Sequence, residues 1–378
     1  LLWFVSCFGM GLAVLAKGLV GVLLPAMIIG LYLLITGRLL ALLKRPSLLL
    51  FGALVFLATT ATWYVPMYLR NGQEFINEFF IAHHFQRFLT NKYRHPQPFY
   101  FFFFVAFVGC FPWLWFFGQQ IVDSIKHWRE ILKAQNQRLR LFLWLWTLIP
   151  IIFFSLSTSK LTGYILPVFP AIALLIGLEL DKLWQGTETL RWRWVHLLTP
   201  LLMLIVSIGV GLKADDELAV SSRTTWIVGG LGIAVSITHL FLLLRNVRTA
   251  TLFLPFAMAA MMVATKLMFL PGLAYVESTR DLALTAARSV RPGERLIFFI
   301  NNHFSIDFYA TDLPLRDEKS YLLTLMKPKE IEDLMKSQPT QSLLVISRER
   351  WSPGLTELMQ AEELGKQGEL VLLRVRPK

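Results

Sequence analysis

The chain has 378 residues, of which 55% are hydrophobic and only 16% charged, and it contains 30 Phe and 12 Trp. Ordinary soluble domains carry about 25% charged residues, so this composition excludes a wholly soluble protein and predicts a multi-span membrane protein. The formal net charge is +12. The charges lie in short loops between apolar runs, so membrane topology accounts for most of them and no nucleic-acid partner is expected.

The chain begins at Leu1, inside an apolar run and without an initiator Met. We interpret it as a fragment whose N-terminal part is missing. Apolar runs of about 17 to 25 residues mark membrane-spanning helices. Candidate spans lie at residues 1–16, 19–36, 47–65, 99–118, 141–156, 164–180, 195–213, 224–244 and 251–271.

Lys and Arg in short loops indicate which span ends face the cytoplasm. Basic residues follow the second, fourth, sixth and eighth candidate spans, so these alternating loops fit one cytoplasmic side. The sequence therefore predicts a multi-pass protein of the inner (plasma) membrane. Its outer side receives residues 65–98, 157–163 and 214–223 and everything after about residue 272.

The first basic residue on the outer side is Lys17, which stands between two apolar segments in LAKGLVG. A lysine deep in the bilayer costs about 2.5–3.5 kcal/mol on insertion scales. At a hinge between two spans its side chain can extend to the outer surface instead. A cation that binds a ligand and a simple interfacial anchor both remain open for Lys17.

The outer loop 65–98 carries an unusual number of cations. Within it, FINEFFIAHHFQRF (75–88) has apolar residues at helical spacing and predicts an amphipathic helix at the membrane interface. Cations on the outer face run against the usual topology, so we expect them to bind a phosphate-bearing ligand, which Arg and Lys recognise. The alternative is that they solvate a loop or meet anionic headgroups. The basic residues are Arg70, His83, His84, Arg87, Lys92, Arg94 and His95.

Lys160 lies in SLSTSKLTGYILPVFP, again on the outer side and between two apolar segments. Hydroxyl-bearing residues surround it, Tyr164 among them. Pro167 and Pro170 break the helix that follows, and such breaks inside a membrane usually line a polar cavity. A purely structural hinge is the alternative.

From about Tyr275 onward charged residues become frequent and the apolar runs shorten. Strands are expected at 294–301, 342–347 and 369–375, and helices at 276–290, 327–336 and 353–366. This alternation predicts a small α/β domain. We therefore expect residues 1–272 to form a transmembrane helical domain and residues 273–378 a soluble extracytoplasmic α/β domain.

Three segments together resemble the C-type (GT-C) glycosyltransferases, and more narrowly the dolichyl-phosphate-mannose protein mannosyltransferase-like family. They are LAKGLVG, HHFQRFLTNKYRHPQPFYFFFFVAFVGCFPW and SLSTSKLTGYILPVFPAIALL. The resemblance implies a multi-span α-helical GT-C-like fold in the lipid bilayer. It also implies transfer of a sugar, hexosyl or pentosyl, from a polyprenyl-phosphate donor to a lipid, protein or glycan acceptor outside the cytoplasm, as in lipid A modification of the cell envelope.

The resemblance and the basic loop together give the residues expected to bind the donor phosphate. These are Lys17, His84, Arg87, Lys92, Arg94, His95, Lys160 and Tyr164. Among them, we expect Arg87 and Lys160 to contact the phosphate.

In the family an acidic residue of the first external loop serves as catalytic base, and that loop would lie upstream of this chain, so the catalytic residue is unknown. Some relatives hold a divalent metal near the lipid phosphate, for which His84 is the only candidate; no other cofactor is expected.

Two other classes of protein remain open. A transporter or flippase of a lipid-linked saccharide would use the same cations without making a bond. A membrane scaffold would instead bind a partner through its outer domain.

Overall fold

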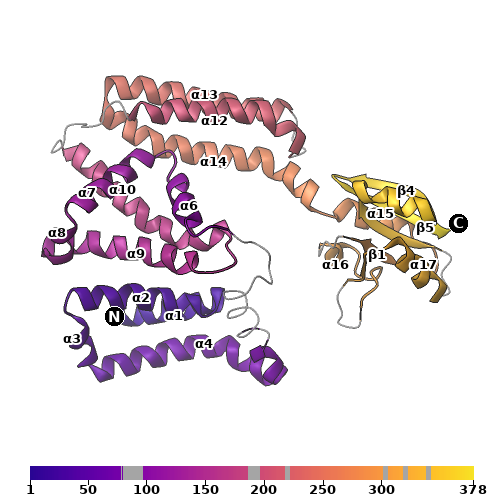
Figure 1. Ribbon diagram of the computed structural model, residues 1–378, viewed down its shortest axis with the longest axis horizontal. Coiled ribbons are helices and arrows are strands. Elements are labelled where there is room, and N and C mark those ends of the chain that lie inside the picture. Colours follow the sequence, from indigo (N-terminus) through magenta and orange to yellow (C-terminus); the bar gives the residue numbers. More distant parts are fainter. Residues whose placement is uncertain are drawn as a thin grey trace. The chain divides into compact units, whose positions relative to one another are not determined.

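The computed structural model describes residues 1–77, 79, 97–185, 196–217, 222–300, 305–317, 322–337 and 342–378. The chain divides into two compact units, Leu1–Thr199 and Pro200–Lys378. The described part of the first unit is helical, and the second combines long helices with a five-stranded sheet (Figure 1).

Unit 1 consists of helices that run back and forth between two ends. Helix α1 packs against α2 and α4, α2 packs against α9, and α10 packs against α7 and α9. The C-terminal ends of α1, α4 and α9 lie at one end of the unit, and α3 and α8 lie at the other (Figure 1). The helices are α1 (Leu2–Lys17), α2 (Val20–Ile35), α3 (Leu39–Leu43), α4 (Pro46–Phe75), α6 (Phe101–Gly109), α7 (Leu114–Lys126), α8 (Trp128–Lys133), α9 (Arg138–Ser155) and α10 (Phe169–Gln185).

Five helical segments of the described chain are long and apolar enough to cross a membrane. Three further apolar helices, Leu2–Lys17, Val20–Ile35 and Leu198–Leu212, are shorter. Large apolar side chains on these helices point outward, as suits contact with lipid. The predicted multi-span helical class is therefore confirmed. The five long segments are Pro46–Phe75, Gln135–Ser155, Thr162–Lys182, Arg223–Arg245 and Val247–Ser289.

The single span predicted at 99–118 is wrong, because the chain forms two helices there, α6 and α7. Between them Trp113 N donates to Cys110 O at 2.6 Å in a tight turn that contains Pro112. Proline lacks the N–H that an α-helix needs and disfavours helical geometry at the residue before it. Pro167 acts similarly: the span predicted at 164–180 opens with a 3₁₀ helix, Thr162–Val168, before α10 begins.

The core of unit 1 lies among α6, α9, the 3₁₀ helix and α10, where Phe102, Leu143, Ile165 and Leu175 are almost fully buried. This packing fixes the turn that joins α9 to the 3₁₀ helix.

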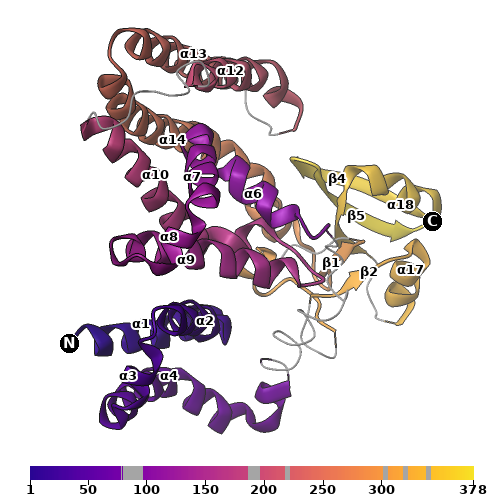
Figure 2. The ribbon, with the colours of Figure 1, turned by 60° about the vertical axis from the view of Figure 1, so that its left-hand side comes forward.

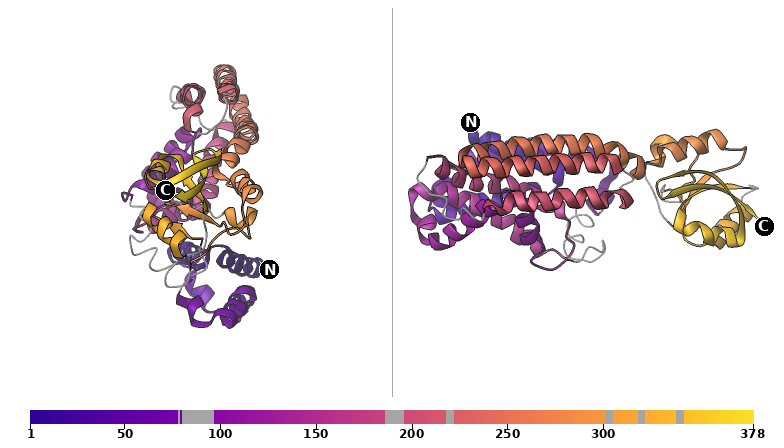
Figure 3. Two further views of the ribbon diagram at one scale, coloured as in Figure 1. Left: turned by 90° about the vertical axis from the view of Figure 1, so that its right-hand side faces the viewer. Right: turned by 90° about the horizontal axis from the view of Figure 1, so that it is seen from above.

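Unit 2 contains most of α12 (Leu198–Glu217) and two further long helices, α13 (Ser222–Arg245) and α14 (Val247–Glu277). A Cβ atom at Gly229 would lie 2.8 Å from Ser207 O, so α12 and α13 approach closely at this glycine. Asn246 caps α14 by accepting a hydrogen bond from Arg248 N at 3.0 Å. Helix α14 continues past α12 and α13 toward the sheet (Figure 3). The domain boundary predicted at 272/273 lies inside α14 and stays a prediction.

A small α/β domain follows, with strand order β2-β1-β3-β5-β4. Strand β1 is parallel to β2 and β3, and β5 is antiparallel to β3 and β4. Its helix α15 packs on one face of the sheet, and α17 and α18 pack on the other. Figure 2 shows α17 and α18 beside the strands. The elements are α15 (Arg280–Ser289), β1 (Leu296–Phe299), α16 (Ile306–Tyr309), β2 (Thr324–Leu325), α17 (Pro328–Ser337), β3 (Leu343–Arg348), α18 (Ser352–Leu358), β4 (Met359–Gln367) and β5 (Leu370–Pro377).

The predicted α/β class of this domain is confirmed, as are three of its strands, β1, β3 and β5. The helix predicted at 353–366 is wrong beyond Leu358, because Met359–Gln367 forms β4. Its sequence favours a helix, but pairing with β5 overrides that local preference. The helix predicted at 276–290 is interrupted at Ser278 and Thr279, where α14 gives way to α15.

The α/β domain contains a buried ion pair between Arg374 and Glu294. Arg374 Nε on β5 donates to Glu294 Oε1 at 2.8 Å, and both side chains are nearly inaccessible. Burial alone would raise the pKa of Glu294. Hydrogen bonds from Ser342 Oγ, Arg291 N and Arg374 outweigh burial and hold that pKa below its usual range.

Candidate functional site

The turn between α9 and the 3₁₀ helix holds a buried lysine. Lys160 is only 7% exposed, and its Nζ donates to Ser157 O at 2.7 Å and to Gln97 O at 3.0 Å. Gln97 is 63 residues earlier in the chain and immediately precedes the Pro98–Tyr100 turn that leads into α6. Lys160 therefore joins the segment that ends at Gln97 to the turn after α9.

The charge of Lys160 has no carboxylate partner within the described part of the chain. Both of its hydrogen bonds go to neutral backbone carbonyl groups, although an ammonium carries three hydrogens. A buried charge normally pairs with an opposite charge, because desolvation is costly. The arrangement thus suits a ligand that brings a negative charge of its own.

Two buried hydroxyl groups lie in the sequence next to this lysine. Ser155 and Ser159 are 3% and 1% exposed, and neither Oγ has a hydrogen-bond partner among the described residues. Ser157 Oγ donates to Ser159 O at 3.0 Å and so tightens the turn. Buried polar groups are almost always hydrogen-bonded, so a polar ligand at this turn would satisfy groups that the described protein leaves open.

Tyr164 lies on the 3₁₀ helix just after Lys160. Its ring packs against Phe154 and Phe102, with centroid distances of 5.3 and 6.4 Å. Trp146 Nε1 on α9 donates to Pro167 O at 3.0 Å and fixes the 3₁₀ helix to α9. The ring of Tyr164 is thus held in place by the core of unit 1.

Lys17 is the last residue of α1 and is exposed. The C-terminal ends of α1 and α9 lie at the same end of unit 1 (Figure 1), so the structure places Lys17 and the Lys160 turn at one end of the helices. Tyr64 on α4 donates through its hydroxyl to Val14 O at 3.4 Å, which ties the last turn of α1 to α4.

Gly21, near the start of α2, lies directly against α1, and its replacement tests how closely the two helices pack. A Cβ atom at Gly21 would lie 2.3 Å from Ala13 C and 2.4 Å from its O, so α1 and α2 would have to separate. Gly21→Ala should therefore lower the free energy of unfolding of the purified protein by about 1–3 kcal/mol, the range for overpacking, and with it the melting temperature. Gly30, also on α2, has nothing within 4 Å of its Cβ position. Gly30→Ala should leave stability unchanged or raise it slightly. Equal melting temperatures for the two variants would contradict this packing.

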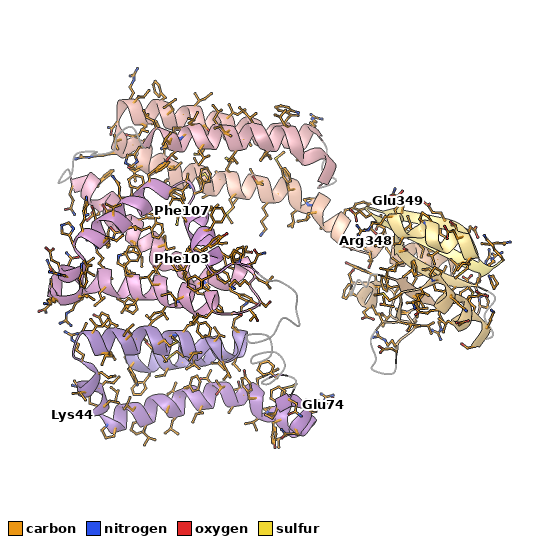
Figure 4. All side chains as sticks on the ribbon, in the orientation of Figure 1. Lys44, Glu74, Phe103, Phe107, Arg348 and Glu349 are labelled. Atoms are coloured by element: carbon orange, nitrogen blue, oxygen red, sulfur yellow. The ribbon has the colours of Figure 1, made fainter. Side chains whose placement is uncertain are left out.

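The remaining predicted phosphate-binding residues, His84, Arg87, Lys92, Arg94 and His95, lie outside the described residues, as does His83. So does most of the helix predicted at 75–88. The described ends of this segment are fixed in unit 1, since it leaves from α4 and returns at Gln97, beside Lys160. Figure 4 places Lys44 and Glu74 at opposite ends of α4. The segment thus starts and finishes at the end of the unit where α1 and α9 also end.

The described ranges contain no group of three His, Cys, Asp or Glu side chains that could hold a metal ion. His84, the predicted metal ligand, lies outside those ranges. The divalent metal therefore stays a prediction.

Sequence reasoning missed the partner of Lys160. Gln97 acts through its backbone carbonyl, which has no residue-type signature. The buried hydroxyl of Ser155 was also missed, because a serine at the end of an apolar run reads as part of a span.

No protein-family model matches the chain. By sequence the chain is similar to proteins named undecaprenyl phosphate-alpha-4-amino-4-deoxy-L-arabinose arabinosyl transferase. The one from Aeromonas hydrophila is 30% identical over 199 residues, which is 52% of this chain and 35% of the relative. The one from Pseudomonas paraeruginosa is 30% identical over 203 residues, 54% of this chain and 35% of the relative. The chain spans about a third of the length of the curated relatives it matches.

Its structure is similar to that of ArnT from Cupriavidus metallidurans, solved bound to undecaprenyl phosphate. The TM-score is 0.72 at 22% sequence identity, over 98% of this chain and 68% of that one. The apo structure of the same protein gives a TM-score of 0.69. These comparisons confirm the resemblance that the three motifs indicated: the chain has the fold of ArnT and is similar in sequence to the arabinosyl transferases named above.

Proposed function

We propose that the protein is a membrane glycosyltransferase that moves a sugar from a polyprenyl-phosphate donor to a lipid, protein or glycan acceptor. The site would face the extracytoplasmic side of the inner membrane, as would the α/β domain. The buried ammonium of Lys160, without a carboxylate partner in the described chain, carries the proposal. The names of the sequence relatives and the ligand of the solved ArnT structure support it, since both contain undecaprenyl phosphate.

The reaction explains why a buried cation is useful. When the bond between the sugar and the phosphate oxygen breaks, its electron pair stays on that oxygen, and the polyprenyl phosphate gains negative charge. A fixed cation in a site of reduced dielectric stabilises this charge more than water would. Among the described residues Lys160 bonds only to Gln97 and Ser157, which hold its position in advance and leave one of its three ammonium hydrogens for such an oxygen.

Deprotonation of the acceptor and positioning of the donor require groups other than Lys160. The acceptor hydroxyl attacks the sugar and gives its proton to a base. The base is proposed to be an acidic residue of an external loop, as the resemblance implies. The prenyl tail lies in the bilayer and restricts where the phosphate can reach. Lys17 and Tyr164 are the other described residues proposed to bind the phosphate, and a divalent metal beside His84 belongs to the same proposal.

The sugar is proposed to be a pentose. The matched relatives are named for 4-amino-4-deoxy-L-arabinose, which supports this choice over a hexose.

The proposal predicts a strong effect at Arg87. Arg87→Ala should lower sugar transfer by the full-length protein by about 100-fold, the loss typical for one group that stabilises developing charge. The measurement is the yield of glycosylated lipid A in proteoliposomes supplied with undecaprenyl-phosphate aminoarabinose. Arg38, exposed where α3 begins at the opposite end of unit 1, provides the control. Arg38→Ala should transfer sugar at the normal rate.

The same assay separates transfer from transport. A glycosyltransferase yields an acceptor of higher mass, with the sugar covalently attached. A flippase moves the intact donor between leaflets and leaves the acceptor unchanged. Movement of the donor without a glycosylated product, with either lipid or protein acceptors present, would overturn the proposed function.

A further inference from the structure

Helix α14 is joined to the α/β domain by one buried side chain. Gln367, at the end of β4, is 1% exposed. Its Nε2 donates to Tyr275 O in the last turn of α14 at 2.8 Å, and its Oε1 accepts from Asp281 N and Leu282 N at 3.1 and 3.2 Å. The same amide therefore holds the end of α14 and the first turn of α15.

A second contact holds α16 to this junction. Thr279, fully buried between α14 and α15, bonds through Oγ1 to Ser305 Oγ at 2.8 Å. Its backbone N donates to the same Ser305 Oγ at 3.3 Å. Ser305 immediately precedes α16, so this short helix is fixed two residues beyond the end of α14.

These contacts lie at one edge of the sheet. In the strand register Phe299 pairs with Leu325 and with Ser347, and Leu370 pairs with Arg348 and with Gln367. The C-terminal ends of the parallel strands β1, β2 and β3 therefore lie at the same edge as the β4–β5 turn that holds α14. Figure 4 places Arg348 and Glu349 on the side of the domain toward α14.

The length of α14 places this edge close to a membrane surface. About 20 helical residues at 1.5 Å each cross the hydrocarbon core of about 30 Å. Counted from Thr251, just after the basic Arg248, the crossing ends at Leu270. The residues from Pro271 onward then lie in the headgroup layer. Tyr275, 47% exposed, fits the aromatic belt found at that depth.

The same edge carries exposed apolar side chains. Phe308 on α16 is 81% exposed, and Met326 directly after β2 is 62% exposed. Apolar side chains of this size on a soluble domain are unfavourable in water. Leu270 and Leu273, near the end of α14, are also exposed.

We propose that this edge of the α/β domain is a membrane-contact surface and that Phe308 inserts into the headgroup layer of the bilayer from which α14 emerges. The binding partner of this surface is the lipid of the bilayer. The Gln367 and Thr279 bonds hold the edge in that position. The inference does not depend on the proposed sugar transfer, since it concerns only where the domain rests.

Spin labelling of the full-length protein in lipid nanodiscs tests this placement. Cys7 and Cys110 are first replaced by Ala, and single labels are then attached at Phe308→Cys or, independently, Met326→Cys. Leu358 is the matched control, because it is 50% exposed and precedes Met359, which pairs with Pro377 at the opposite edge of the sheet. Power saturation then compares the access of oxygen and of a water-soluble nickel chelate to each label.

The label at 308 should show several-fold higher oxygen access relative to nickel access than the label at 358, because oxygen concentrates in lipid and the chelate stays in water. The ratio of oxygen access to nickel access for the label at 326 should lie between the ratios at 308 and 358. Equal ratios at 308 and 358 would overturn the proposal. So would low access of both reagents at 308, since that result means burial against protein.

Discussion

Replacing Lys160 by Met is expected to lower sugar transfer by the full-length protein by about 100-fold or more. Methionine keeps the length and apolar character of the stem but removes the charge that is proposed to face the leaving phosphate. Losses of this size are typical when one preorganised group that stabilises developing charge is removed. The substitution also leaves the carbonyl groups of Gln97 and Ser157 without their donor. The measurement is the initial rate of acceptor glycosylation in proteoliposomes, normalised to the amount of folded protein.

The control is Lys126→Met. Lys126 is exposed at the end of α7, next to α8 and at the end of unit 1 opposite the Lys160 turn. Its replacement should leave the rate within about twofold of normal, as surface substitutions usually do. Normal transfer by Lys160→Met, with melting unchanged, would mean that the buried ammonium is only a structural clamp.

Arg374→Met is expected to destabilise the α/β domain by about 3–5 kcal/mol. Removing one partner of a buried ion pair leaves the other charge uncompensated, and costs of this size are typical. Glu294 would keep its bonds from Ser342 and Arg291 but lose its only described cationic partner at hydrogen-bond distance. Hydrogen exchange followed by mass spectrometry on the whole protein should show faster exchange in β1, β3 and β5.

Arg376→Met provides the comparison on the same strand. Arg376 is 42% exposed and approaches only Glu362, at 4.0 Å, among the described acids. Pairs of this kind contribute about 0–1 kcal/mol. Similar exchange in the two variants would show that the Arg374–Glu294 pair is replaceable. Faster hydrogen exchange in Arg374→Met but not in Arg376→Met would show that the buried Arg374–Glu294 pair stabilises the sheet.

The parts of the fold that the sequence predicts correctly are those where local pattern and tertiary packing agree. Long apolar runs became long helices, and the apolar segments around Phe298, Ile346 and Leu372 became central strands. The failures occur where the two conflict. Pro112 divides an apolar run that has the length of a span, and β4 takes a sequence with good helix formers because β5 offers it a partner.

Some features of the candidate site can be predicted from the sequence and others cannot. Lys17, Lys160 and Tyr164 are visible in the sequence as polar residues at the borders of apolar runs. The bond from Lys160 to Gln97 is not, because it joins positions 63 residues apart through a backbone carbonyl. The helix directions explain why distant loops meet, since α1, α4 and α9 all end at the same end of unit 1.

The central claim is that Lys160 binds the phosphate of a prenyl carrier. Native mass spectrometry of the purified full-length protein, with undecaprenyl phosphate and undecaprenol offered in equal amounts, tests it most directly. The protein should retain undecaprenyl phosphate in large excess over the alcohol, and Lys160→Met should lose that preference while still binding both lipids weakly. Equal retention of the two lipids by the unmodified protein, or an unchanged preference in Lys160→Met, would contradict the account.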